Sequence, residues 1–164
     1  MIFGVSTLTF VHTALSLIAL VAGLVVVFGL PSSRAFPLWT GLFLVTAILT
    51  SVTGFFFPFE HFLPSHWFGV ISLIALGGAI LARYTFEYSG AWRWLYVLTV
   101  LIGTYLLAFV TIVQAFQKIP ALHALAPTQS ELPFAVAQLV TLVVFLGLGF
   151  VAIRKFNLGP ARFA

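Results

Sequence analysis

Long apolar stretches divide the chain, and each is long enough to cross a lipid bilayer. A transmembrane helix needs about 20 consecutive, mostly apolar residues. Five segments meet this requirement, at residues 5–30, 38–57, 66–86, 93–117 and 134–153. Prolines, or the polar stretch 87–90, separate them, as is typical of turns between spans. The pattern predicts an all-α integral membrane protein, with residues 1–164 forming one domain built as a five-transmembrane-helix bundle.

Small and polar residues recur inside these segments every three or four positions, which places them on one face of each helix. Small side chains let membrane helices approach closely, and hydroxyls can bond across or along helices. We therefore interpret these faces as packing surfaces. The pairs Ala75/Ala79 and Gly78/Ala82 favour the third helix as the most closely packed. The other packing faces consist of His12, Ser16, Ala19 and Gly23 in the first helix and Thr46, Thr50, Thr53 and Gly54 in the second.

Composition supports the membrane assignment and excludes several classes of function. Hydrophobic residues make up 62% of the chain and charged residues 6%, whereas soluble domains have about 25% charged residues. The chain has no cysteine, which excludes disulfides, cysteine-bound metals and thiol catalysis. A net charge of +4 would suggest nucleic acid in a soluble protein, but basic residues spread over loops are better explained as topology signals. We expect no nucleic-acid partner.

The distribution of basic residues predicts the orientation of the bundle. If the five segments all cross, six of the seven Lys and Arg residues fall on one side, and only Lys118 falls on the other. Because cytoplasmic flanks of membrane proteins are enriched in Lys and Arg, we expect the N-terminus outside and the C-terminus in the cytoplasm. The six residues are Arg34, Arg83, Arg93, Arg154, Lys155 and Arg162.

Sequence motifs give no support for nucleotide binding or for the common hydrolytic sites. The chain has neither a phosphate-binding P-loop nor a dinucleotide-binding glycine motif, so we expect no nucleotide. It also contains no aspartate, which excludes a Ser-His-Asp triad and aspartate-dependent proteolysis. Whether the protein has a catalytic activity of its own is left open, and none is indicated.

Polar side chains with useful chemistry gather toward the predicted outer face. His12 lies about two turns inside the first helix, and His66 lies at the start of the third. His61 and His123 fall in outer loops. This one-sided distribution favours an outward-facing site whose hydrogen-bonding groups come from the fourth and fifth helices. The candidate site residues are His12, His66, Gln114, Gln117 and Gln138.

Histidine at such a site can bind haem iron or copper, or exchange a proton with a quinone. A haem b held by two histidines needs two imidazoles that face each other, and His12 with His66 is the one plausible pair; the same two residues are the metal ligands if copper binds. A quinone needs less: one histidine, a Gln or carboxylate, and aromatic walls. The outer end has many such rings, including Phe55, Phe57 and Phe68.

Each of these residues also has a structural interpretation. Gln114 and Gln138 can share a hydrogen bond between helices, and Arg83 can pair with Glu87 four residues later. Residues 120–126 favour a short helix on the membrane surface. Thr128-Gln-Ser-Glu131 matches a capping box before the last span.

Taken together, the sequence favours a small multi-pass protein of the bacterial inner membrane. The leading hypothesis is a subunit or ligand-binding component of a larger respiratory or photosynthetic complex, which takes part in electron transport and holds quinone or haem at its outer face. Its partners would be the lipid bilayer and other membrane subunits, or further copies of itself. A purely structural accessory subunit and a small oligomeric transporter or channel are the alternatives.

Overall fold

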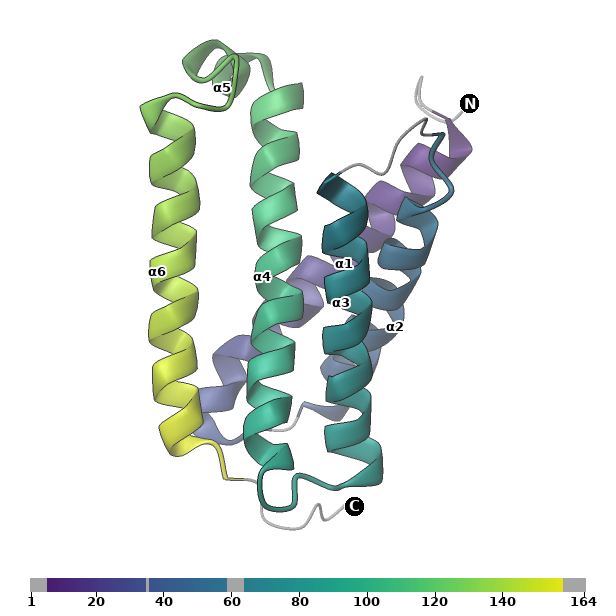
Figure 1. The fold of residues 1–164 in the computed structure, drawn as a ribbon, viewed down its shortest axis with the longest axis vertical. Helices are drawn as coiled ribbons and strands as arrows, with labels where there is room; N and C mark the ends of the chain where they lie inside the picture. Colours follow the sequence, from purple (N-terminus) through teal and green to yellow (C-terminus); the bar gives the residue numbers. More distant parts are fainter. Residues whose placement is uncertain (1–5, 35, 59–63, 158–164) are drawn as a thin grey trace.

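A computed structural model describes residues 6–34, 36–58 and 64–157. Every regular element in these ranges is a helix (Figure 1). The five membrane spans, Thr7–Ser32, Pro37–Gly54, His66–Thr85, Trp92–Lys118 and Leu132–Lys155, confirm the predicted number and lie within a few residues of the predicted positions. The elements are α1 (Thr7–Gly29), η1 (Leu30–Ser32), α2 (Pro37–Gly54), α3 (Pro64–Ile80), a π-helical turn η2 (Leu81–Thr85), α4 (Trp92–Lys118), α5 (Pro120–Leu125) and α6 (Leu132–Lys155).

The long helices alternate in direction, so the bundle has two distinct ends (Figure 1). The start of α1, the end of α2, the start of α3 and the short α5 lie at one end, which we call the histidine end because it carries His12, His66 and His123. We call the opposite end the basic end because it carries Arg34, Arg83, Arg93, Arg154 and Lys155.

Helix α4 is the centre of the bundle. It packs against α1, α3 and α6, while α1 and α2 form an extensive antiparallel pair. The span of α4 buries a larger share of its residues than that of α3, and the span of α6 is the least buried. The helix that the sequence favoured as most closely packed, α3, is therefore less enclosed than α4, because α4 has neighbours on three sides.

The closest packing occurs where α1, α2 and α4 meet at Phe43. The fully buried Phe43 ring lies between Gly23 of α1 and Gly103 of α4. A Cβ atom on Gly23 would lie 2.7 Å from Thr104 Oγ1 and 2.9 Å from the Phe43 ring, and one on Gly103 would lie 3.3 Å from the same ring. The predicted small-residue face of α1 is thus a packing surface, on which Ala19 is fully buried as well.

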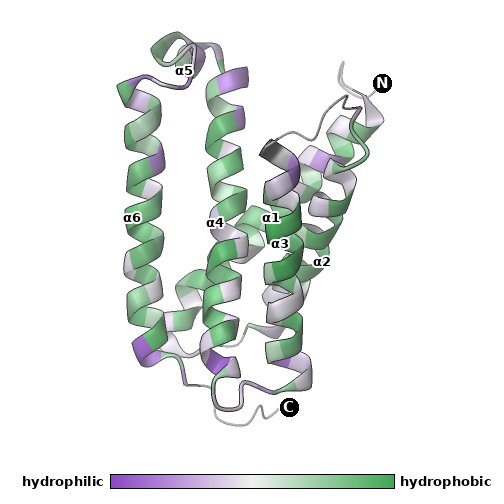
Figure 2. Ribbon diagram, in the orientation of Figure 1, coloured by the Kyte–Doolittle hydropathy of each residue, from purple (hydrophilic) through white to green (hydrophobic). Residues whose placement is uncertain are grey.

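The helices are mostly hydrophobic along their length, and hydrophilic residues concentrate near their ends (Figure 2). Large hydrophobic side chains such as Leu38, Ile74 and Leu146 are more than 60% exposed. Such a surface is incompatible with water over so large an area and is typical of contact with lipid. The chain is a multi-pass membrane protein that contacts the lipid bilayer.

The connection between α4 and α6 at the histidine end partly matches its prediction. The expected short helix is present as α5. The Glu131 carboxylate accepts hydrogen bonds from the Thr128 N–H at 3.2 Å and the Thr128 hydroxyl at 2.9 Å. Glu131, not Thr128, occupies the N-cap position of α6, and its side chain makes no capping bond to the helix. The capping box was therefore wrong in register, because Pro133 has no N–H to donate and is tolerated only in the first turn of a helix.

Candidate functional site

His12 is held against the last turn of α2. Its Nδ1 lies 2.9 Å from Thr53 Oγ1. The Thr53 hydroxyl donates its only hydrogen to a carbonyl of its own helix, that of Leu49 at 2.7 Å or of Thr50 at 3.1 Å. When the Thr53 hydroxyl donates to one of these carbonyls, its oxygen accepts from His12, and the imidazole then carries its proton on Nδ1. In the neutral ring this leaves Nε2 with a lone pair.

The surroundings of His12 are apolar and aromatic. Its ring meets the Phe57 ring edge-on, with 5.1 Å between centroids. On the other side it lies over Gly54, where a Cβ atom would be 3.6 Å from His12 Cε1. The residue is half-buried, and the bond to Thr53 restricts the orientation of its ring. Such a group can accept a hydrogen bond or bind a metal ion.

His66 packs against the same end of α2 from the other neighbouring helix. It is 5% exposed, and its ring stacks on Phe55 with 5.5 Å between centroids. The Phe55 ring also covers Gly69, one turn further along α3, where a Cβ atom would lie 3.1 Å from the ring. Phe55 thus fills the space between α2 and the first turns of α3.

The structure brings both histidines to the end of α2 but does not place their rings in contact with each other. His12 reaches Thr53 and Phe57 from α1, whereas His66 reaches Phe55 from α3. We define the histidine site as His12, Thr53, Phe55, Phe57 and His66. Glu60 and His61, which the sequence also placed at this end, lie outside the described residues.

The three candidate glutamines make no described contact with the residues of the histidine site. Gln114 and Gln117 are exposed on α4. Gln138 of α6 donates from Nε2 to the Phe109 carbonyl of α4 at 3.2 Å. The expected bond between helices is therefore present, but its acceptor is a backbone carbonyl and not Gln114. A fourth glutamine, Gln129, ties the α5–α6 loop to α4 by a 2.8 Å bond from its Nε2 to the Val113 carbonyl.

We expect the Gln138→Leu variant to change the free energy of unfolding by less than about 1 kcal/mol. The variant loses a hydrogen bond, which in membrane bundles averages about 0.6 kcal/mol. It also removes Oε1, which is buried with no hydrogen-bond partner among the described residues. Unfolding by SDS in mixed micelles measures the change. A loss above about 2 kcal/mol would show that Gln138 contributes more than the Phe109 bond.

A second polar cluster, at the basic end, was missed by the sequence analysis. Arg83 lies in η2, is 2% exposed, and donates from Nη1 to the Tyr88 hydroxyl. The Tyr88 ring packs edge-on against Tyr96, with 4.8 Å between centroids, and both contact Phe156. Tyr96 reaches Thr40 of α2 at 3.4 Å. We call these five residues the arginine–tyrosine cluster.

The expected ion pair between Arg83 and Glu87 was wrong. The chain leaves the helix after Thr85, and Glu87 and Tyr88 have left-handed backbones with φ of 43° and 59°. This turn carries Glu87 to the surface and directs the Tyr88 side chain inward. Burial, and then the neighbouring Tyr96, raise the pKa of Tyr88 despite Arg83, so its phenol is neutral. The sequence signal that could have revealed the cluster was Arg83 among Tyr84, Tyr88 and Tyr96.

Within residues 6–34, 36–58 and 64–157, no three His or acidic side chains converge as a metal-binding group. Comparison of the chain with protein-family models, with curated proteins and with solved structures gave no match. Any functional assignment therefore depends on the geometry of the sites described above.

Proposed function

We propose that this protein is a small membrane subunit that binds a quinone at its histidine end, with His12 as the principal hydrogen-bonding residue. The observation that supports this most strongly is the bond between His12 and Thr53. With Thr53 as the acceptor, this bond selects the neutral tautomer whose Nε2 carries the lone pair, which is the form needed to accept a hydrogen bond from a quinol hydroxyl. Phe55 and Phe57 supply aromatic surfaces beside it.

Haem b and copper use the same imidazole lone pair, so both stay as rival ligands within this proposal. Iron held by two histidines would need His12 and His66 to face each other across the ligand. In the structure His12 contacts Thr53 and Phe57, whereas His66 stacks on Phe55. This arrangement favours the quinone, since a quinone needs only one imidazole. The chemistry assigned to the chain is limited to binding and to holding a proton at His12 Nε2.

The setting of the proposal follows from charge and surface. The concentration of basic residues at one end supports an orientation with that end in the cytoplasm and the histidine end outside. Short connections and the apolar exterior support a place in a bacterial inner membrane, beside a larger respiratory or photosynthetic complex. Helix α6, whose span is the least buried of the five, offers a face for such a partner.

Substitutions around His12 test this function. We expect His12→Phe to abolish quinone binding, because it removes the acceptor and keeps the ring volume. Thr53→Val should weaken binding about fivefold, the effect of losing about 1 kcal/mol of hydrogen bonding, because the imidazole is then free to change its tautomer and direction. Thr53→Ser keeps the hydroxyl and should restore binding. Titration with a short-chain quinol in detergent measures each affinity.

His123→Phe is the matched control, because His123 is an exposed histidine of α5 at the same end. It should bind quinol as the wild type does. Equal affinities for the wild type, His12→Phe and Thr53→Val would refute the assignment of His12. An equal loss in His123→Phe would show that the effect is not specific to the histidine site.

A further inference from the structure

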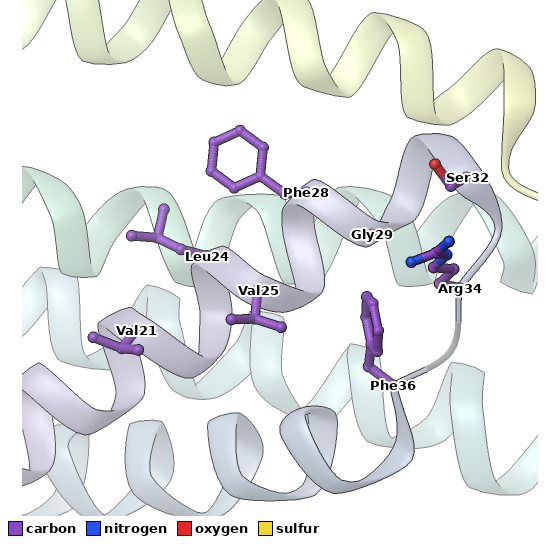
Figure 3. A pocket seen from close by; sticks show the side chains of 8 residues that line it. All are labelled: Val21, Leu24, Val25, Phe28, Gly29, Ser32, Arg34 and Phe36. Carbon is purple, nitrogen blue, oxygen red and sulfur yellow. The ribbon is translucent and has the colours of Figure 1, made fainter.

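An apolar groove runs along α1 at the basic end of the bundle, far from the histidine site (Figure 3). Its volume is about 450 Å³. Apolar side chains from the last turns of α1 form its length, and the linker that follows α1 forms its end. Its lining includes Val21, Leu24, Val25, Phe28, Arg34 and Phe36.

The end of the groove is shaped by close packing between Phe36 and Gly29. Phe36 has a left-handed backbone with φ of 37° and directly precedes α2. Its ring lies so close to Gly29 that a Cβ atom there would collide with it. The following Pro37 begins α2, and its ring restricts the backbone of Phe36 before it. Gly29 and Phe36 thus close the apolar groove beside Arg34.

Positive charge gathers at this closed end. Arg34 is exposed and lines the groove. The neighbouring Ser33 joins the linker to the end of α6, since its Oγ donates to the Lys155 carbonyl at 3.0 Å and accepts from the Asn157 N–H at 2.9 Å. Lys155 and the preceding Arg154 are exposed as well. No Asp or Glu occurs in residues 21–36 or 150–157.

We propose that this groove binds an anionic phospholipid, with an acyl chain along Val21–Phe28 and the phosphate beside Arg34. The apolar residues extend over eight positions of α1, about 10 Å at the rise of a helix, and end where a headgroup would lie. The acyl chains of lipids contact other apolar parts of the bundle equally well, so apolar contact alone gives no selectivity. Selectivity therefore comes from the charge: an anionic headgroup near basic side chains gains about 1 kcal/mol for each, which corresponds to about fivefold in affinity.

Retention of lipid by purified protein tests the site. The wild type and variants are reconstituted in vesicles of phosphatidylcholine with phosphatidylglycerol, extracted in a non-ionic detergent, and analysed by native mass spectrometry. We expect the wild type to retain phosphatidylglycerol over phosphatidylcholine. Arg34→Gln should lower this preference about fivefold. Arg93→Gln is the control, because it removes a charge at the same end, where Arg93 lies over Trp94 and not in the groove.

A second variant tests the contribution of the apolar groove independently of the charge of Arg34. Val25→Trp fills the apolar part without changing the charge, and we expect it to lower retention as well, so the test stands even if Arg34→Gln does not fold. Unchanged retention in Val25→Trp, or an equal loss in Arg93→Gln, would overturn the proposal. A second copy of the chain in the groove would instead show as a dimer that Val25→Trp disrupts while the bound lipid stays constant, and this also overturns it.

Discussion

The Gly23→Val variant should lose about 3 kcal/mol of its free energy of unfolding, the upper part of the range for overpacked cores. Even a single Cβ atom at this position would lie 2.7 Å from Thr104 Oγ1 and 2.9 Å from the Phe43 ring. Neither neighbour can move away, because Thr104 and Phe43 are both fully buried. A larger side chain at position 23 can therefore be accommodated only if α1 moves away from α2 and α4. Unfolding by SDS in mixed micelles measures the loss.

Gly147→Val is the matched control for Gly23→Val. Gly147 lies in α6, and a Cβ atom there would meet nothing within 4 Å, so the stability should stay within about 1 kcal/mol of the wild type. A rescue identifies the contact: Gly23→Ala should be destabilised, and adding Thr104→Ala should recover part of the loss, because the two sites couple. Equal stabilities of Gly23→Val and Gly147→Val would contradict the packing of α1, α2 and α4.

The second large effect concerns the arginine–tyrosine cluster. Tyr88→Phe should cost about 3 kcal/mol, because it removes the Tyr88 hydroxyl that accepts from the buried Arg83 guanidinium. Arg83 already has one unsatisfied atom, since Nε is buried with no hydrogen-bond partner among the described residues. Arg83→Met removes both the buried charge and the guanidinium N–H groups that require hydrogen-bond acceptors. We expect Arg83→Met to be neutral or stabilising.

The double variant decides between a charge effect and a simple loss of packing. If the buried charge causes the cost, Arg83→Met combined with Tyr88→Phe should be clearly more stable than Tyr88→Phe alone. The free energies of unfolding of the four proteins, measured in one micelle composition, form the complete cycle. Additive losses in the two single variants would show that the cation and the phenol do not depend on each other.

Hydropathy alone was sufficient to predict the number and approximate positions of the spans. The reason is physical: in hydrocarbon every backbone group must be satisfied inside the chain, so an apolar segment of about 20 residues has to be a helix. Small residues at helical spacing likewise identified the buried face of α1, including Ala19 and Gly23. These features depend on local sequence, which is why they could be predicted.

Features that depend on which helices meet could not be predicted in the same way. Periodicity does not show that α4 has three neighbours, or that Gln138 finds the Phe109 carbonyl. The pair of Arg83 and Glu87 failed because a π-helical turn and two left-handed residues ended the helix where the spacing rule assumed that it continued. The start of α6 was also predicted wrongly, because Pro133 has to lie in the first turn of the helix and the capping pattern did not take this into account.

The histidine site likewise has one feature that the sequence predicted and one that it did not. The concentration of His12 and His66 at one end was evident from the sequence, and the structure brings both to the end of α2. The partner that gives His12 its tautomer, Thr53, is 41 residues away in the chain and was assigned only to a packing face. Packing of α1 against α2 brings the polar face of each helix together, and this places His12 within hydrogen-bond distance of Thr53.

The most direct test of the histidine site is the ligand content of the protein itself. Detergent-purified wild type is examined by absorption, oxidised and then reduced with dithionite, and the same sample is extracted with organic solvent for quinones. We predict quinone in a stoichiometric amount, lost in His12→Phe and kept in His123→Phe. A Soret band with sharp reduced bands would identify haem in its place. A colourless, quinone-free protein would contradict the account and leave a structural subunit.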